Sequence, residues 1–215
     1  AELADVKRAA GRSNDPVTVV TVTKTQPRDR ILEAIEAGAT DIGENYLQEA
    51  REKFADLPAV RKHFLGHVQT NKAKGIVEEF DMVQSVDRLD AGRALAKAAR
   101  TVGKTLAVLV QVNISATERF GTPPDGAERL AEQLREEGLV VEGVMAIGPN
   151  SGDENDVLRA FERAAQTFSR VGGKTLSLGM SGDWPQAVRC GSTMIRLGTS
   201  LFGPRAQKTP AEVRG

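Results

Sequence analysis

The chain has 215 residues, and its 29 Lys and Arg balance 29 Asp and Glu, so the formal net charge at pH 7 is zero. Hydrophobic residues make up 40% and charged residues 27%, the balance of a globular protein rather than a disordered one. Neutrality argues against nucleic-acid binding, and no apolar run approaches the roughly 20 residues of a membrane span. Cys190 is the only cysteine, which excludes an internal disulfide and a cysteine-rich zinc site. We therefore expect a cytoplasmic protein with neither nucleic-acid nor membrane partners.

Runs of β-branched and other apolar residues alternate along the chain with longer amphipathic segments. The runs predicted as strands are 17–22, 39–43, 63–66, 81–86, 105–114, 139–148, 175–179 and 193–198. The segments predicted as helices are 29–38, 45–54, 69–80, 88–103, 125–138, 153–172 and 183–191. Several helical segments end in glycine, as helix C-termini commonly do, and we expect Asp125, Asp153 and Asp183 to be N-caps.

The alternation of strands and helices predicts parallel strands joined by right-handed crossovers. Dividing the 215 residues among eight units gives about 27 per unit, close to the roughly 30 of a β–α unit. We therefore predict an α/β fold, a (β/α)8 barrel of the TIM type. It would form a single domain over 1–215, with an N-terminal helix and tail (1–16) and a polar end (204–215). An open doubly wound sheet is the alternative, because 39–43 and 63–66 are weak strands and six strands would suffice.

Two motifs that suggest nucleotide or metal binding fail on their spacing and context. The GKT triplets at 103–105 and 173–175 precede predicted strands and lack the glycine that a P-loop has five residues earlier. His63 and His67 have the i, i+4 spacing of a helical metal site, but they lie in a predicted strand and loop. No Glu stands between them as in HExxH. We therefore expect neither a P-loop nor a metal site.

Small and hydroxylated residues follow the last two predicted strands. Ser181 stands between glycines after the seventh strand, and Gly198, Thr199 and Ser200 follow the eighth. In a TIM-type barrel these two loops commonly hold phosphate groups through backbone N–H groups and small hydroxyls. The alternative is that both loops are simple turns, their usual role elsewhere.

Lys24 stands at the end of the first predicted strand. Alternation places it on the same face as Val20 and Val22, which is the interior in a barrel, and strand ends form the catalytic rim. A desolvated lysine there can form a Schiff base with an aldehyde. A lysine that extends to solvent is the alternative. A rim lysine together with a phosphate loop fits pyridoxal 5′-phosphate (PLP), which carries both an aldehyde and a phosphate.

The chain resembles the pyridoxal-phosphate homeostasis proteins, the YggS/PROSC family. The matching segments are 21–27, 43–50, 63–72, 85–88, 112–115, 145–147, 176–183 and 191–203. The resemblance implies a barrel of the alanine racemase N-terminal type, with Lys24 as the Schiff-base lysine. The chain departs from the family pattern at His67-Val68 and at the RFG segment, 119–121, which stands where a Lys-x-Gly is more usual. Its N-terminal helix is also short for the family.

The resemblance also implies the remaining contacts to PLP. It places Asn45 near the ring, Ser181, Gly198 and Thr199 at the phosphate, and Arg196 opposite the pyridine nitrogen. Alternation with Met194 directs Arg196 into the barrel mouth, where a permanently charged arginine would donate to an unprotonated ring nitrogen. The alternative is that Arg196 pairs with a carboxylate at the rim.

The expected function is that of a monomeric carrier or buffer in intracellular cofactor homeostasis, without appreciable catalysis. It would bind PLP, with apo-forms of PLP enzymes as candidate recipients. The alternative is a PLP-dependent amino-acid racemase or another weak PLP enzyme. The racemases that resemble this barrel add a β domain and a catalytic tyrosine from the partner. Tyr46 is the only tyrosine here, and the chain ends soon after its last predicted strand. A phosphosugar-binding barrel enzyme would leave Lys24 unexplained.

Overall fold

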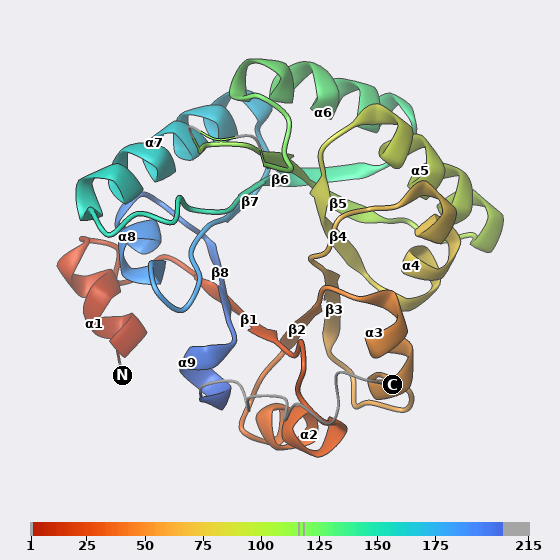
Figure 1. Cartoon of the computed structure of the whole chain (residues 1–215), viewed down its shortest axis with the longest axis horizontal. Coiled ribbons are helices and arrows are strands. Elements are labelled where there is room, and N and C mark those ends of the chain that lie inside the picture. Colours follow the sequence, from red (N-terminus) through yellow and green to blue (C-terminus); the bar gives the residue numbers. More distant parts are fainter. Residues whose placement is uncertain (1, 116, 118, 204–215) are drawn as a thin grey trace.

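The computed structural model describes residues 2–115, 117 and 119–203. Eight parallel strands form a closed barrel, in which each strand pairs with the next along the chain and the last pairs with the first (Figure 1). The strands are β1 (Thr18–Val22), β2 (Asp41–Glu44), β3 (Arg61–Phe64), β4 (Met82–Val86), β5 (Ala107–Val112), β6 (Val140–Ala146), β7 (Thr175–Ser177) and β8 (Met194–Leu197). The predicted barrel is confirmed, and the open sheet was the wrong alternative.

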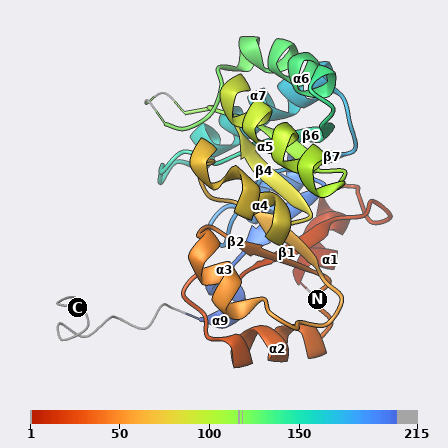
Figure 2. The ribbon, with the colours of Figure 1, turned by 90° about the vertical axis from the view of Figure 1, so that its right-hand side faces the viewer.

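Helices surround the barrel and cover the outside of its wall (Figure 1). They are α1 (Glu2–Ala9), α2 (Arg28–Glu36), α3 (Leu47–Lys53), α4 (Ala73–Glu79), α5 (Leu89–Val102), α6 (Ala127–Glu136), α7 (Glu154–Val171), α8 (Trp184–Arg189) and α9 (Thr199–Phe202), with 3-10 turns η1 (Thr70–Lys72) and η2 (Pro124–Gly126). From the side, α3, α4 and α5 follow one another along the outer surface (Figure 2). Every segment predicted as helical contains a helix, and the N-terminal helix is present.

The aspartates predicted as N-caps behave in three different ways. Asp153 caps α7, because its Oδ1 accepts a hydrogen bond of 2.8 Å from the backbone N–H of Asn155. Asp183 precedes α8, but its carboxylate accepts from the Met180 N–H behind it and makes no capping bond. The prediction for Asp125 was wrong, since two consecutive prolines begin a 3-10 turn that contains it.

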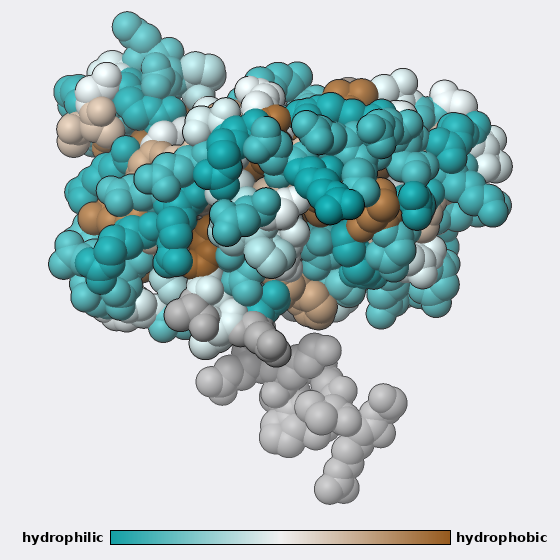
Figure 3. All heavy atoms as spheres, turned by 90° about the horizontal axis from the view of Figure 1, so that it is seen from above, coloured by the Kyte–Doolittle hydropathy of each residue, from teal (hydrophilic) through white to brown (hydrophobic). Residues whose placement is uncertain are grey.

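The short helix α9 was not expected. Its four residues follow β8 directly, and so short a segment carries no helical periodicity in the sequence. The predicted polar end, 204–215, lies outside the described residues. No helix among the described residues is both long and apolar enough to cross a membrane. The face of the molecule drawn in Figure 3 is mostly hydrophilic, with hydrophobic residues scattered between polar ones.

The barrel wall separates two buried regions. Along β5, Val108 and Val110 point outward into the large core beneath the helices, whereas Ala107 and Leu109 point into the barrel. The interior of such barrels is usually filled with layers of bulky apolar side chains. Here much of it is polar, and the buried polar side chains that hydrogen-bond across it are Asp41, His63, Gln84, Ser177 and Arg196.

Candidate functional site

Lys24 lies in a tight turn just after β1, and its side chain is half-buried. The next residue, Thr25, has a φ of +67°, a left-handed conformation that β-branched residues rarely adopt. The backbone N–H of Thr25 donates a hydrogen bond of 3.1 Å to Oε2 of Glu49 in α3. Strained backbone persists only where its surroundings enforce it and often occurs at functional sites. The carboxylate of Glu49 therefore stabilises the turn that presents Lys24.

The carboxylates of Glu49 and Glu44 lie next to this turn, and each accepts a hydrogen bond from a residue beside Lys24. Burial tends to raise the pKa of Glu49, but hydrogen bonds from Lys53 and Thr25 outweigh it, so the pKa lies below its ordinary value. The positive charge of Lys24 acts in the same direction. Glu44, at the end of β2, is fully buried, and burial raises its pKa above the ordinary value. Glu49 is thus held as an anion close to the Lys24 turn.

Lys24 and Arg196 come from strands that pair directly. Val20 of β1 is the register partner of Arg196 in β8, and Lys24 lies four residues beyond Val20 toward the carboxyl end. Val19 and Ile195 pack in an apolar cluster outside the barrel, against α1 and α8. Alternation therefore directs their neighbours Val20 and Arg196 inward. This confirms the predicted inward direction of Arg196. The carboxyl ends of both strands face the same end of the barrel, which is where TIM-type barrels hold their ligands.

Arg196 is almost completely buried, with 5% of its surface exposed. Nη1 donates to the Ser177 carbonyl at 2.9 Å and to Ser177 Oγ at 2.7 Å, and Nη2 donates to the Ala146 carbonyl at 2.9 Å. A guanidinium has five N–H donors, so these three acceptors, which are the ones found among the described residues, leave donors available. Burial lowers the pKa of Arg196 to about 10, and the negative charge of Asp183 partly opposes this shift. The alternative prediction was that Arg196 pairs with a carboxylate. Among the described residues, its hydrogen-bond acceptors are carbonyl and hydroxyl oxygens instead.

The loops after β7 and β8 meet at Ser181. Its Oγ accepts hydrogen bonds from the backbone N–H of Gly198 at 3.4 Å and of Ser200 at 3.2 Å. Thr199 lies between them and is exposed as the first residue of α9. The three residues predicted to contact a phosphate are therefore brought together. Two backbone N–H groups converge on one oxygen here, an arrangement that suits an anionic oxygen equally well.

Asn45 follows β2 at the mouth of the barrel. A Cβ on Gly66 would lie 2.0 Å from the carbonyl oxygen of Asn45, so only glycine permits this approach of the loop after β3. Asn45 lines a cleft of about 760 Å³, and a neighbouring cleft of about 940 Å³ shares His67 and Phe120 with it. The predicted residue thus lies at an opening large enough for a small ligand.

Two of the departures from the family pattern, His67 and the RFG segment, are in contact with each other. The rings of His67 and Phe120 stack with centroids 4.0 Å apart, although 62% of the surface of Phe120 is exposed. Arg88 Nη1 donates to His67 Nε2 at 3.1 Å. Arg119, the first residue of the RFG segment, donates to the Gly148 carbonyl at 3.3 Å. These residues form one wall of the mouth together.

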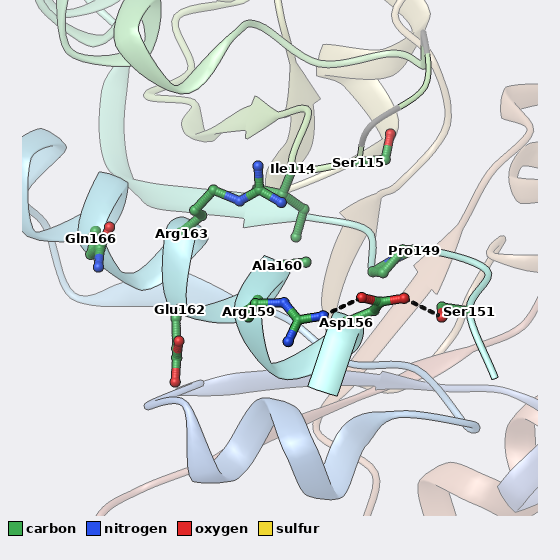
Figure 4. A pocket seen from close by; sticks show the side chains of 10 residues that line it. All are labelled: Ile114, Ser115, Pro149, Ser151, Asp156, Arg159, Ala160, Glu162, Arg163 and Gln166. Atoms are coloured by element: carbon green, nitrogen blue, oxygen red, sulfur yellow. Dashed lines mark hydrogen bonds and ion pairs between the residues drawn. The ribbon is translucent and has the colours of Figure 1, made fainter. Parts of the chain in front are cut away.

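A further pocket, of about 460 Å³, lies between α7 and the loops that follow β5 and β6 (Figure 4). Both carboxylate oxygens of Asp156, which lines this pocket, already accept hydrogen bonds, one from Arg159 and the other from Ser151. None of the six residues predicted from the sequence lines this pocket. It therefore does not coincide with the site at the carboxyl ends of β1 and β8.

Glu49 and Ser177 were missed by the sequence analysis. Glu49 reads as one of many charges on an amphipathic helix, and its bond to Thr25 spans 24 positions in the chain. Ser177 carries a usable signal, because alternation along 175–179 places it on the opposite side of the strand from Leu176 and Leu178, which pack into the core outside the barrel.

The chain is similar in sequence to known proteins over nearly its whole length. The family model described as the N-terminal domain of alanine racemase matches residues 3–206. The pyridoxal phosphate homeostasis protein of Pseudomonas aeruginosa is 38% identical over 98% of this chain and 94% of its own length. The protein of the same name from Escherichia coli K12 is 37% identical over 91% of this chain and 88% of its own. The chain belongs to the pyridoxal phosphate homeostasis protein family.

Solved structures agree with this assignment. PipY of Synechococcus elongatus with PLP bound has a TM-score of 0.81 and 34% identity, covering 94% of this chain and 100% of its own. Alanine racemase of Clostridium difficile has a TM-score of 0.71 at 14% identity, covering 96% of this chain but 56% of the racemase. The likeness to the racemase shows a shared fold alone.

Proposed function

We propose that this protein binds PLP through a Schiff base to Lys24 and acts as a carrier or buffer of the cofactor without appreciable catalysis. The observation that carries the proposal is the pairing of β1 with β8. It brings a half-buried lysine and a buried guanidinium, whose partners among the described residues leave some donors available, to one end of the barrel. PipY, which shares the fold and 34% of its sequence, has been solved with PLP bound.

The chemistry of the residues fits each part of the cofactor. The amine of Lys24 would hold the aldehyde, and the spare donors of Arg196 would face the ring nitrogen. Ser181, Gly198 and Thr199 would hold the phosphate, because the Gly198 and Ser200 N–H groups already converge on a hydroxyl oxygen. Asn45 would lie beside the ring. When bound, PLP can withdraw electrons from an attached amine.

The environment of Arg196, taken together with the single candidate base at Lys24, favours a carrier over a racemase. Even with its pKa lowered to about 10, Arg196 keeps its proton at neutral pH, so it would donate to the ring nitrogen of bound PLP. An unprotonated ring withdraws electrons poorly, which discourages loss of an α-proton. Lys24 would be one base, but the only tyrosine, Tyr46, has 55% of its surface exposed. The curated relatives are named homeostasis proteins.

The test is to locate the lysine that carries the cofactor. Purified protein with PLP is reduced with borohydride, and the labelled peptide is identified by mass spectrometry. We expect the label on Lys24. The Lys24→Ala variant should lose the visible absorbance of the bound cofactor yet keep its circular dichroism spectrum, because a half-buried rim lysine contributes little to the core. Lys174→Ala, whose lysine side chain is 73% exposed, is the matched control and should bind normally. A label on Lys174 or another lysine would show that the assignment is wrong.

A further inference from the structure

A continuous line of hydrogen bonds crosses the inside of the barrel from β8 to β2. Arg196 Nη1 lies 2.7 Å from Ser177 Oγ, which lies 2.7 Å from Gln84 Oε1. Gln84 Nε2 lies 2.9 Å from His63 Nδ1, and His63 Nε2 lies 2.8 Å from Oδ1 of Asp41. The three central residues have no exposed surface. The line therefore joins a buried guanidinium to a carboxylate through side chains of β7, β4 and β3.

Only one direction of donation satisfies every group along this line. Ser177 Oγ already accepts from the guanidinium, so its own O–H donates to Gln84 Oε1. The amide nitrogen of Gln84 then donates to His63 Nδ1 and to the sulfur of Met194, 3.2 Å away. His63 must therefore be the neutral tautomer with its proton on Nε2, from which it donates to the carboxylate.

Reversal of the Gln84 amide would break the line at both ends. The Ser177 hydroxyl would then face an N–H donor while still accepting from the guanidinium, so its proton would have no acceptor. The amide oxygen would face the Met194 sulfur, and His63 would need a proton on Nδ1. Buried polar networks are costly when only partly satisfied. The tautomer of His63 and the orientation of the Ser177 hydroxyl are therefore coupled.

The end of the line at Arg196 has a consequence for ligand binding. The acceptors around the guanidinium among the described residues are neutral oxygens of Ser177 and Ala146. A carboxylate in direct contact would have neutralised the charge and occupied the donors in pairs. Because its acceptors are neutral, the guanidinium keeps its full charge. The hydrogen bond from the Ser177 hydroxyl to Gln84 fixes the orientation of that hydroxyl, and therefore of the lone pair that accepts from Arg196 Nη1. The plane of the guanidinium, and hence the direction of its spare donors, is set from inside the barrel.

We propose that Asp41, His63, Gln84 and Ser177 act together as positioning residues, which hold Arg196 as a charged donor aimed at the ring nitrogen of PLP. The proposal rests on the proposed function for its ligand. The line itself is a property of the protein without cofactor and can be tested there. A barrel interior needs only apolar filling for stability, and positioning of Arg196 explains why this one is polar.

The first measurement uses the protein without PLP. Long-range ¹H–¹⁵N correlation spectra report which nitrogen of each histidine carries a proton, and the chain has only two histidines. We expect the Nε2–H tautomer for His63 at pH 7. In the Ser177→Ala variant, the Nε–H of Arg196 should exchange with solvent at least tenfold faster. Ser192→Ala is the matched control, because Ser192 is equally buried and its Oγ contacts only backbone groups.

The second measurement adds PLP labelled with ¹⁵N in the ring. The ring nitrogen signal should move in Ser177→Ala and stay at the wild-type position in Ser192→Ala, a difference that a merely structural role would not produce. A proton on Nδ1 of His63, or unchanged exchange at Arg196, would overturn the line. An unmoved ring signal would overturn its role toward PLP. Failure to bind PLP at all would instead refute the proposed function, while the measurements without cofactor would still decide whether the line exists.

Discussion

At the scale of single residues, Asp41 couples the barrel interior to pH. Burial tends to raise its pKa, but hydrogen bonds from His63 and Thr40, together with nearby positive charge such as that of Arg61, hold the pKa below its ordinary value of 3.8. A carboxyl whose pKa is lower in the folded state binds fewer protons there than in the unfolded state. Its contribution to stability is therefore complete above about pH 4 and is lost as the pH falls through the lowered pKa.

The Asp41→Asn variant tests this linkage. We expect it to be less stable than the wild type at pH 7, and the difference in unfolding free energy should stay constant down to about pH 4. Below the ordinary value of 3.8, the difference should shrink, because the wild type then protonates Asp41 on unfolding. Urea unfolding at pH 7, 5, 3.5 and 3 measures it, with Asp125→Asn at an exposed position as the control. A difference that grows in acid would contradict the sign.

Gly198 is the second residue with a specific prediction. A Cβ there would meet Val22 at 3.5 and 3.6 Å, which are ordinary contacts, so Gly198→Val should fold. Its side chain would fill the space between the ends of β8 and β1, where we place the phosphate. Hydrogen bonds to charged groups contribute about 1.5–3 kcal/mol each, so we expect the Kd for PLP to rise about tenfold or more.

Unphosphorylated pyridoxal provides the comparison for this variant. Its affinity should change far less than that of PLP, because it has no group in the loop. Gly182→Val in the neighbouring loop, where a Cβ would meet nothing within 4 Å, is the control and should bind both ligands normally. Titration of both ligands by absorbance measures the two affinities, and equal weakening would show that this loop does not contact the phosphate.

At the scale of elements, α7 and α6 begin in different ways. Asp153 satisfies a backbone N–H in the first turn of α7, whereas Asp125 lies within the 3-10 turn before α6 and makes no cap. Removal of an N-cap side chain costs about 1 kcal/mol. We expect Asp153→Ala to lower the unfolding free energy by about 1 kcal/mol. Asp125→Ala should change it by only about 0.3 kcal/mol. Chemical denaturation of both variants decides, and equal losses would contradict the assignment of the caps.

At the scale of the whole molecule, closure of the barrel brings the first and last strands together. Lys24 after β1 and the loop after β8 are separated by most of the chain, yet the pairing of β1 with β8 makes them neighbours. The same closure leaves no unpaired strand edge. All candidate cofactor contacts then lie in or around one end of the barrel, so the molecule as a whole defines the site.

The choice between carrier and enzyme also belongs to the whole molecule. We expect the PLP-loaded protein, incubated with L-alanine and other amino acids in deuterated water, to show no α-proton exchange beyond a single turnover. The reason is that, in the proposed binding mode, Arg196 would leave the ring nitrogen unprotonated, and Tyr46 is the only tyrosine. Proton NMR of the recovered amino acids measures exchange, with free PLP as the blank. Repeated exchange that disappears in Lys24→Ala would establish a racemase-type activity instead.

The sequence alone was sufficient for the eight strands, for the helices α1 to α8 and for their order. Each of the eight predicted strands is present, because alternation and β-branched composition act over a few neighbouring residues. The cap at Asp153 is equally local. The helix α9 and the 3-10 turn around Asp125 were missed because such short segments are decided by a few backbone hydrogen bonds that leave no pattern in composition.

Only the tertiary structure decided how these elements work together. Closure of the barrel depends on the pairing of β1 with β8, and no local pattern encodes a contact between the two ends of a chain. The same holds for the carboxylate of Glu49 beneath Thr25 and for the hydrogen bonds that join Ser177 to Gln84, 93 positions apart. Residue type and alternation determine which side chains face inward, but hydrogen bonds depend on distance and direction in space. Those distances exist only once the barrel has closed.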